Sequence, residues 1–339
     1  MMQSPQQNSG HPTMIGSASR RRILIATLTG LSAASLSRSA LAAPATVELD
    51  WVDTTRGRPV PVRLHLPATA MQSEPASPLV VFSHGLGGSR FGYTWLGSYL
   101  AECGLASLHV QHVGSDRTIW AERGNPLALL GLMREATSEQ EAIARVHDIR
   151  FALDQLQASG FARRIETSRV IAAGHSYGAN TAMLLSGARI DRRDFDTRLA
   201  DRRIAGAILI SAPPFHGEGA PEPILAPLKL PTLHVTSTDD VIRVPGFFSD
   251  LDDRLAIFRA VSSWDKTLAV YSGGSHSMFT DRLWPGGEAL NRSVKLATRE
   301  LAAGFVERIL RGQSARLTGW ADRHASILER FVDSPARSS

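Results

Sequence analysis

The stretch Gly174-His175-Ser176-Tyr177-Gly178 decides the fold of this chain. It directly follows a short apolar run, Val170–Ala173, and it precedes a helical pattern that begins at Ala179. A serine in this setting lies at a sharp strand-to-helix turn, where side chains on the flanking glycines would collide with the backbone. The five-residue pattern alone is weak evidence, because a glycine-rich turn without chemical use has the same letters. Its place between a strand and a helix is what predicts a nucleophilic serine.

Short apolar runs alternate with helical patterns on both sides of this turn. Each expected strand is bounded by Gly, Pro, Asp or Ser, and the strands lie at Leu79–Phe82, Ala106–Val110, Val170–Ala173, Ile204–Ile210, Thr232–Val235 and Leu268–Tyr271. Helical periodicity is clearest over Glu141–Gln157 and recurs over residues 89–103, 178–188, 250–264 and 289–311. Strands that are apolar on both faces are typical of parallel sheets.

The alternation predicts an α/β fold: a mostly parallel, doubly wound sheet with helices on both faces and a small cap or loop insertion. We expect one domain over residues 44–339, with an antiparallel edge hairpin made by Thr46–Val52 and Val60–Leu66. The expected insertions are Arg117–Thr137 and Pro213–Leu230. The second contains five prolines, so we expect it to be ordered but not helical.

Composition narrows the class of protein. The 339 residues are 43% hydrophobic and 20% charged, as in an ordinary globular protein. The net charge of +5 does not indicate a nucleic-acid partner, because four arginines and no acids lie within residues 1–43. The remainder carries 33 basic against 32 acidic side chains, a net of +1. The single cysteine, Cys103, excludes an intramolecular disulfide and a cysteine-based zinc site.

Residues 1–43 have the order of features found in an export signal. Three arginines, Arg20–Arg22, precede a mildly apolar stretch, Ile23–Leu36, and Ala40-Leu41-Ala42 supplies a small-x-small cleavage site. The paired arginines resemble a twin-arginine signal. The alternative is a membrane anchor, which needs about 20 apolar residues, more than this stretch has. We expect cleavage after Ala42 or Ala43, no stable membrane span afterwards, and a periplasmic or secreted protein.

A serine hydroxyl needs a base within hydrogen-bond reach, and the base needs an acid to orient it. The candidate base is His276, in a loop that leaves the last apolar strand. We interpret three other histidines as structural or surface residues: His216, His234 and His324. The acid should follow Thr232–Val235, where Asp239 and Asp240 are adjacent. We favour Asp239, because it follows three loop residues after that strand, and Asp240 is the alternative.

The oxyanion formed in acyl transfer also needs hydrogen-bond donors. One candidate is the backbone N–H of Tyr177, directly after the serine. The second is the N–H of Leu86, in the loop His84-Gly85-Leu86-Gly87-Gly88 that follows the first buried strand. The spacing of that loop does not match a phosphate-binding turn, because it lacks both the Lys-[Ser/Thr] pair and the dinucleotide pattern.

Together these parts resemble the α/β-hydrolase superfamily over nearly the whole mature chain. Within it, Phe82–Arg90, Gly174–Gly178 and His112–Asp116 resemble the predicted dienelactone hydrolases and the platelet-activating-factor acetylhydrolase-like esterases. The resemblance implies Ser176 as nucleophile, His276 as base and the Leu86 and Tyr177 amides as oxyanion hole. Two departures are clear. The acetylhydrolases place the acid where this chain has Ile210-Ser211-Ala212, and true dienelactone hydrolases have a cysteine in place of the serine.

The sequence therefore predicts an exported serine hydrolase of carboxylic esters that needs no cofactor and no metal. Its expected partner is a small-molecule or lipid-like ester, and nucleic acid is not expected. The alternatives are an acyltransferase or amidase with the same triad, or a non-catalytic binding protein on the same fold. Five aromatic residues near the expected site either line an acyl pocket or anchor local packing: Trp120, Phe215, Phe247, Phe248 and Trp284. His84, His109 and His112 lack the carboxylate spacing that a metal site would need.

Overall fold

The computed structural model describes residues 43–68, 76–122, 124–190, 199–244, 246–281 and 287–334. These residues belong to one structural unit, Leu41–Ser339. The predicted export signal lies outside the described residues, apart from Ala43. No helix within the described ranges combines the length and the apolar character that a bilayer span requires.

Nine of the described strands form one mixed sheet in the order β1-β2-β4-β3-β5-β6-β7-β10-β11. The strands are β1 (Ala45–Asp53), β2 (Arg58–Leu66), β3 (Ser77–Ser83), β4 (Ala106–Val110), β5 (Ile165–His175), β6 (Ile204–Ile210), β7 (Thr232–Ser237), β10 (Lys266–Tyr271) and β11 (Leu328–Ser334). The six central strands, from β4 to β10 in that order, run parallel. The strands β1, β2 and β11 pair antiparallel at the two edges. The predicted parallel sheet and the edge hairpin are confirmed.

Alternate side chains of the central strands pack against helices on opposite faces of the sheet. On β3, Leu79 and Val81 belong to one buried cluster and Val80 and Phe82 to the other. The first cluster includes side chains of α3 (Glu139–Ala158), α4 (Tyr177–Leu185) and α6 (Leu251–Ala260). The second includes side chains of α1 (Thr94–Glu102), α7 (Glu288–Arg311) and α8 (Trp320–Arg323).

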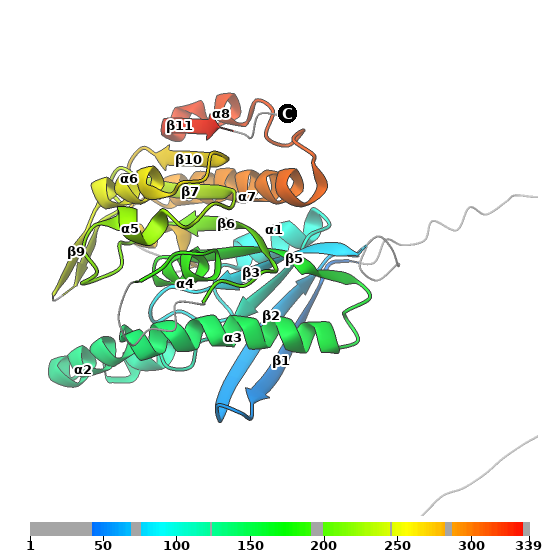
Figure 1. Cartoon of the computed structure of the whole chain (residues 1–339). Coiled ribbons are helices and arrows are strands. Elements are labelled where there is room, and N and C mark those ends of the chain that lie inside the picture. Colours follow the sequence, from blue (N-terminus) through cyan, green and yellow to red (C-terminus); the bar gives the residue numbers. More distant parts are fainter. Residues whose placement is uncertain are drawn as a thin grey trace, which may run out of the picture. The chain divides into compact units, whose positions relative to one another are not determined.

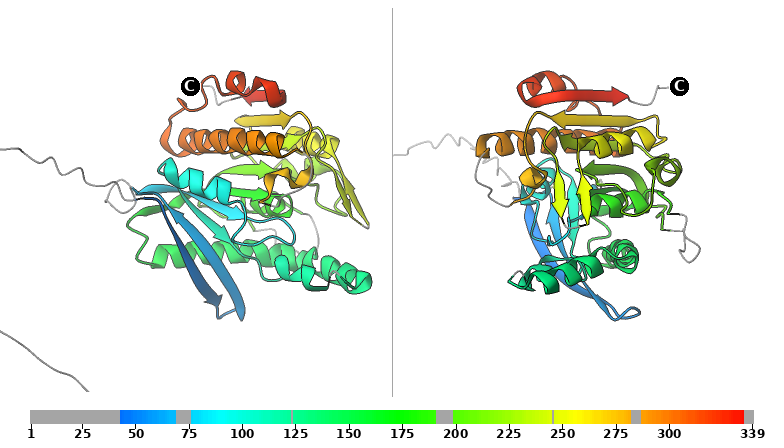
Figure 2. Two further views of the ribbon diagram at one scale, coloured as in Figure 1. Left: turned by 180° about the vertical axis from the view of Figure 1, so that it is seen from behind. Right: turned by 90° about the vertical axis from the view of Figure 1, so that its left-hand side faces the viewer.

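The two faces are seen separately in the figures. Figure 1 shows α3 and α4 in front of the sheet, and the reverse view in Figure 2 brings α1 and α7 to the front. Because both faces are covered, most side chains of the central strands are buried, including polar ones such as His109 on β4 and His234 on β7. This arrangement confirms the predicted fold class.

Both expected insertions contain helix. The segment Arg117–Thr137 forms a 3₁₀ turn and then α2 (Pro126–Ala136), whose start is capped by the Asn125 side chain. The segment Pro213–Leu230 contains the short helix α5 (Pro221–Leu225). The prediction that this segment is not helical is wrong, because proline in the first turn of a helix removes no hydrogen bond. A small ribbon, β8 (Ile242–Val244) and β9 (Phe247–Ser249), has no counterpart in the sequence prediction.

Six histidines are buried within the described ranges: His65, His84, His109, His112, His175 and His234. Burial lowers the pKa of His175 and His234 to about 3 and that of His65 to about 4, because an imidazolium loses its hydration in the interior. The folded protein therefore keeps these rings neutral at a pH where the unfolded chain protonates them.

We expect the free energy of unfolding to decrease as the pH falls from about 6.5 toward 4, because only the unfolded state then binds protons at these rings. Above that window the rings are neutral in both states and have no effect. His234→Gln removes one such ring, so the slope of the unfolding free energy against pH should decrease by up to about 1.4 kcal/mol per pH unit. Urea unfolding at several pH values measures both slopes, and equal slopes would contradict the prediction.

Candidate active site

Ser176 lies between the end of β5 and the start of α4, at the turn that the sequence predicts. Its backbone has φ 53° and ψ −125°, a conformation that residues with a side chain seldom adopt. Backbone strain of this kind persists only where the surroundings impose it, and it is common at functional sites. The Ser176 N–H donates to the carbonyl of Ile210 on β6 at 2.9 Å, which fixes the turn to the sheet.

The glycines around the serine are required by close backbone approach. A Cβ on Gly174 would collide with the carbonyl oxygen of Gly178, and a Cβ on Gly178 would collide with that of Ser83 at the end of β3. A Cβ on Gly85 would lie 3.2 Å from the His175 ring. The first turn of α4 therefore packs directly on the backbone at the end of β3, as the collision argument predicts.

His276 connects the serine to a buried carboxylate. Its Nε2 accepts a hydrogen bond from Ser176 Oγ at 2.9 Å, and its Nδ1–H donates to Asp240 Oδ1 at 2.7 Å. This tautomer is the one that leaves Nε2 free to take a proton from the serine. The structure thus brings together Ser176 and His276, the nucleophile and base that the sequence predicts.

The acid on His276 is Asp240, so the choice of Asp239 is wrong. Asp240 is fully buried, whereas Asp239 is exposed and its carboxylate contacts the Thr238 hydroxyl. The predicted strand ends at Val235, but β7 continues to Ser237. The turn that follows therefore lies further along the chain, and the inward-facing carboxylate is the second of the pair.

The surroundings of Asp240 favour its charged form. Burial acts to raise the pKa of this carboxyl, but the hydrogen bond and charge of His276 and the charge of Arg254 outweigh burial and hold the pKa well below its usual range. Thr236 Oγ1 donates to Asp240 Oδ2 at 2.7 Å, and Arg254, on α6, lies 3.4 Å from Oδ1. Asp240 is therefore an ionised acceptor for the His276 N–H.

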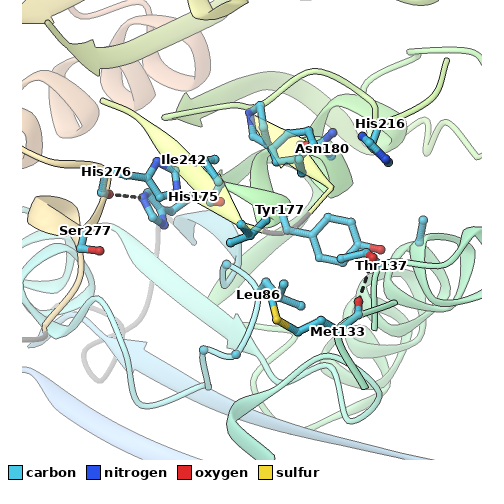
Figure 3. Close-up of a pocket in the computed structure, with 18 of the residues that line it drawn as sticks. Leu86, Met133, Thr137, His175, Tyr177, Asn180, His216, Ile242, His276 and Ser277 are labelled. Atoms are coloured by element: carbon cyan, nitrogen blue, oxygen red, sulfur yellow. Dashed lines mark hydrogen bonds between the residues drawn. The ribbon is translucent and has the colours of Figure 1, made fainter. Parts of the chain in front are cut away.

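Leu86 and Tyr177 line the same cavity as Ser176 and His276. Tyr177 is the first residue of α4, and the amides of a first helical turn have no acceptor within the helix. In the loop that contains Leu86, the Gly87 N–H donates to the carbonyl of Ser115, and the Gly88 N–H donates to the carbonyl of Gly85. Figure 3 shows Leu86 and Tyr177 between His175 and His276 on one side and Met133 and Thr137 on the other.

A second histidine, His175, supports the position of His276. Its Nε2–H donates to the His276 carbonyl at 3.1 Å (Figure 3), and its Nδ1 accepts from the Tyr93 hydroxyl at 2.8 Å. The Tyr93 oxygen also accepts the Gly85 N–H at 3.4 Å. The sequence prediction missed both His175 and Tyr93. Only His175 could have been considered from the sequence, because it directly precedes Ser176 in the motif.

The remaining histidines have other contacts. His234 bonds Thr232 within β7, and His324 bonds Glu300. His216 lines the cavity, but its ring packs edge-on against Phe247 and does not reach the serine. Within the described ranges, no three His, Cys, Asp or Glu side chains come together as metal ligands would.

Ser176 lines a cavity of about 1530 Å³. Its walls come from the Leu86 loop, α2, α4, the segment Pro213–His216 and the β8–β9 ribbon. Of the five aromatic residues considered above, Trp120, Phe215 and Phe247 line it, whereas Phe248 is 57% exposed and Trp284 lies outside the described residues. Asn180 also lines it, and its buried Oδ1 has no hydrogen-bond partner among the described residues.

The correction of the acid leads to a prediction. Asp240→Asn should slow the reaction of Ser176 with a fluorophosphonate by about 10³–10⁴-fold, because the amide favours the wrong tautomer of His276. Asp239→Asn is the matched control and should change the rate by less than about twofold, since an exposed surface carboxylate contributes little. Stopped-time labelling followed by intact-mass analysis measures both rates. A large loss of rate in Asp239→Asn together with a small loss in Asp240→Asn would show that Asp239 is the acid.

Comparison with known proteins identifies the family of the chain. A search of curated proteins found no match. The model of the alpha/beta hydrolase family, in contrast, matches residues 80–333, a segment that includes Leu86, Ser176, Asp240 and His276. The match spans more than half of the chain, from the middle of β3 to β11, and it shows that the protein belongs to the alpha/beta hydrolase family.

Proposed function

We propose that this hydrolase cleaves carboxylic esters through an acyl-enzyme, with Ser176 as nucleophile, and that it acts after export. The observation that carries the proposal is the hydrogen-bonded series Ser176–His276–Asp240, with 2.9 Å and 2.7 Å between the bonded atoms. A serine is activated in this way for attack on an acyl carbon. The family match supports a hydrolase, and the series supports serine chemistry within it.

In the first half of the proposed reaction, Ser176 Oγ attacks the ester carbonyl carbon while His276 Nε2 takes its proton. Asp240 accepts the Nδ1–H bond and stabilises the imidazolium without becoming protonated itself. The developing oxyanion accepts hydrogen bonds from the Leu86 and Tyr177 amides, each worth about 2.7–4 kcal/mol of transition-state stabilisation. His276 then gives the proton to the leaving alcohol, which leaves an acyl-enzyme.

In the second half, water takes the place of the alcohol. His276 removes a proton from water, the hydroxide oxygen attacks the acyl carbon, and a second oxyanion forms at the same two amides. Its collapse returns the proton to Ser176 Oγ and releases the carboxylic acid. Apart from the ester and water, the steps use only side chains and amides of the chain, so the proposal requires no cofactor.

The cavity favours an ester with bulky apolar groups. A volume of about 1530 Å³ exceeds the roughly 300–1,000 Å³ that is common for small-molecule sites. Its walls include apolar side chains from four segments: Trp120, Leu130, Met133, Ile190, Phe215 and Phe247. A small-molecule or lipid-like ester is the proposed substrate. The three segments Phe82–Arg90, Gly174–Gly178 and His112–Asp116 support the narrower likeness to the predicted dienelactone hydrolases and the acetylhydrolase-like esterases.

Replacement of the nucleophile provides the direct test of the proposed function. Ser176→Ala should reduce the hydrolysis of short-chain p-nitrophenyl esters by at least about a thousandfold, because no covalent intermediate can form. The mass adduct formed by a fluorophosphonate should vanish in the same variant. Ser277→Ala is the matched control, since Ser277 lines the cavity beside the base and has no role in the proposed steps.

Different results would favour the other candidates. A well-folded wild-type protein that forms no adduct would favour a non-catalytic binding protein. An adduct without ester hydrolysis would favour an amidase, and a product analysis in which an added alcohol outcompetes water would favour an acyltransferase.

Export is proposed from the order of features in residues 1–43. Replacing Arg20 and Arg21 together by lysine should leave the precursor uncleaved in the cytoplasm, because a twin-arginine signal depends on that pair. Cell fractionation and the mass of the exported protein measure this, and the mature chain should begin at Ala43 or Pro44. Arg38→Lys is the matched control. Normal export of the double variant would contradict the twin-arginine assignment.

A further inference from the structure

Arg145, on α3, is a fully buried cation close behind the candidate site. Burial of a guanidinium is expensive, because the group loses its hydration. Burial lowers the pKa of Arg145, yet an arginine remains protonated at any pH where the enzyme would work. Its hydrogen bonds go to hydroxyl and carbonyl oxygens. The charges of Glu141 and Asp148 attract the cation, while its hydrogen bonds go to groups beside the two candidate oxyanion donors.

One side of the guanidinium holds the loop that contains Leu86. Nη2 donates to the His84 carbonyl and, at 3.0 Å, to Ser83 Oγ, so the chain is fixed directly before Gly85-Leu86. Nη1 donates to Ser115 Oγ at 2.7 Å. The Ser115 carbonyl accepts the Gly87 N–H at 2.9 Å, which fixes the chain directly after Leu86.

The other side holds the start of α4. Nε donates to Thr181 Oγ1 at 3.0 Å, and the guanidinium carbon lies 4.4 Å from the centre of the Tyr177 ring. Stacking of a cation on an aromatic face is attractive, and more so when both groups are desolvated. One side chain therefore contacts both segments that carry the two candidate oxyanion donors.

The groups that accept from Arg145 are themselves fixed. Ser115 Oγ donates to Glu141 at 2.7 Å, and Glu141 pairs with Arg58. The Ser83 hydroxyl is 3.0 Å from His112 Nε2, and the His112 Nδ1–H donates to Asp148 at 3.1 Å. Buried networks in which every member is satisfied are rigid, so Arg145 has a stiff frame to hold the loop against.

We propose that Arg145 is a positioning residue that sets the Leu86 and Tyr177 amides for the oxyanion, and that its buried charge makes this region favourable for a negative oxygen. The inference rests on the proposed function, since only an acyl-transfer reaction forms that oxyanion. A preorganised site of this kind acts on the transition state and not on the bound ester. Replacement of Arg145 should therefore lower kcat and leave KM nearly unchanged.

The experiment compares three substitutions in the mature protein. Arg145→Met removes the charge and the hydrogen bonds at similar length, Arg145→Lys keeps the charge, and Thr181→Val removes one hydrogen bond. For each variant we would measure kcat and KM with a p-nitrophenyl ester, the inhibition constant of a trifluoromethyl ketone, and the thermal midpoint. The ketone forms a tetrahedral adduct whose oxygen occupies the place of the oxyanion.

Arg145→Met should lower kcat by about 10²–10³-fold, as loss of one oxyanion donor does, with KM changed by less than about threefold. The inhibition constant of the ketone should rise by the same factor as kcat/KM falls. Arg145→Lys should recover part of the loss, and Thr181→Val should lose a few-fold. The matched control is Arg203→Met, which removes a partly buried arginine that bonds Asp201 and Asp154 before the amino end of β6, whereas Ser176 lies at the carboxyl end of that strand. It should lower the thermal midpoint and leave kcat unchanged.

Each outcome has one meaning. If the wild type hydrolyses esters and folded Arg145→Met keeps its kcat and its ketone affinity, the positioning role is wrong and the proposed function stands. If Arg145→Met does not fold, unchanged kcat and ketone affinity in both Arg145→Lys and Thr181→Val overturn the role equally. If the wild type neither hydrolyses esters nor reacts with a fluorophosphonate, the proposed function fails and this inference fails with it.

Discussion

The close approach of Gly178 to the backbone of Ser83 is the constraint on which the site depends. Because no side chain separates them, α4 starts directly on the end of β3, and the turn before it must be sharp. The sharp turn places Ser176 in its strained conformation with its hydroxyl toward His276. It also sets the first amide of α4 beside the loop that continues from β3. The position of the proposed nucleophile, Ser176, and of the two candidate oxyanion donors thus depends on one contact between backbones.

Two sets of hydrogen bonds fix His276, Asp240 and the Leu86 loop in position. Tyr93 and His175 join the Gly85 amide to the carbonyl of His276, so the loop of the base and the loop of Leu86 are linked through a neutral ring. Arg254 and Thr236 fix Asp240 from α6 and β7. These buried hydrogen bonds leave Ser176, His276 and Asp240 few alternative positions.

The pairing of Ser176 with His276 could be predicted from the sequence because each residue follows a recognisable apolar strand in the expected order. The acid was misassigned by one position. Asp239 and Asp240 are chemically equal, and the choice depends on whether β7 ends at Val235 or at Ser237, which composition does not reveal. Arg145 was missed for a different reason. Arg145, Glu141 and Asp148 are all buried on α3. A search for apolar periodicity assigns charged residues to the surface, so it does not detect buried charges.

The outer wall of the cavity is built from segments that hold none of the reacting groups. Leu130 and Met133 come from α2, and Ile242, Val244 and Phe247 come from the β8–β9 ribbon, whereas Ser176, Asp240 and His276 follow strands of the sheet. Mutations in that wall can therefore accumulate without disturbing the turn at Gly178. Related hydrolases can therefore differ in the substrates they accept while they keep the same arrangement of Ser176, His276 and Asp240. Substitutions in the wall offer a protein engineer the same freedom.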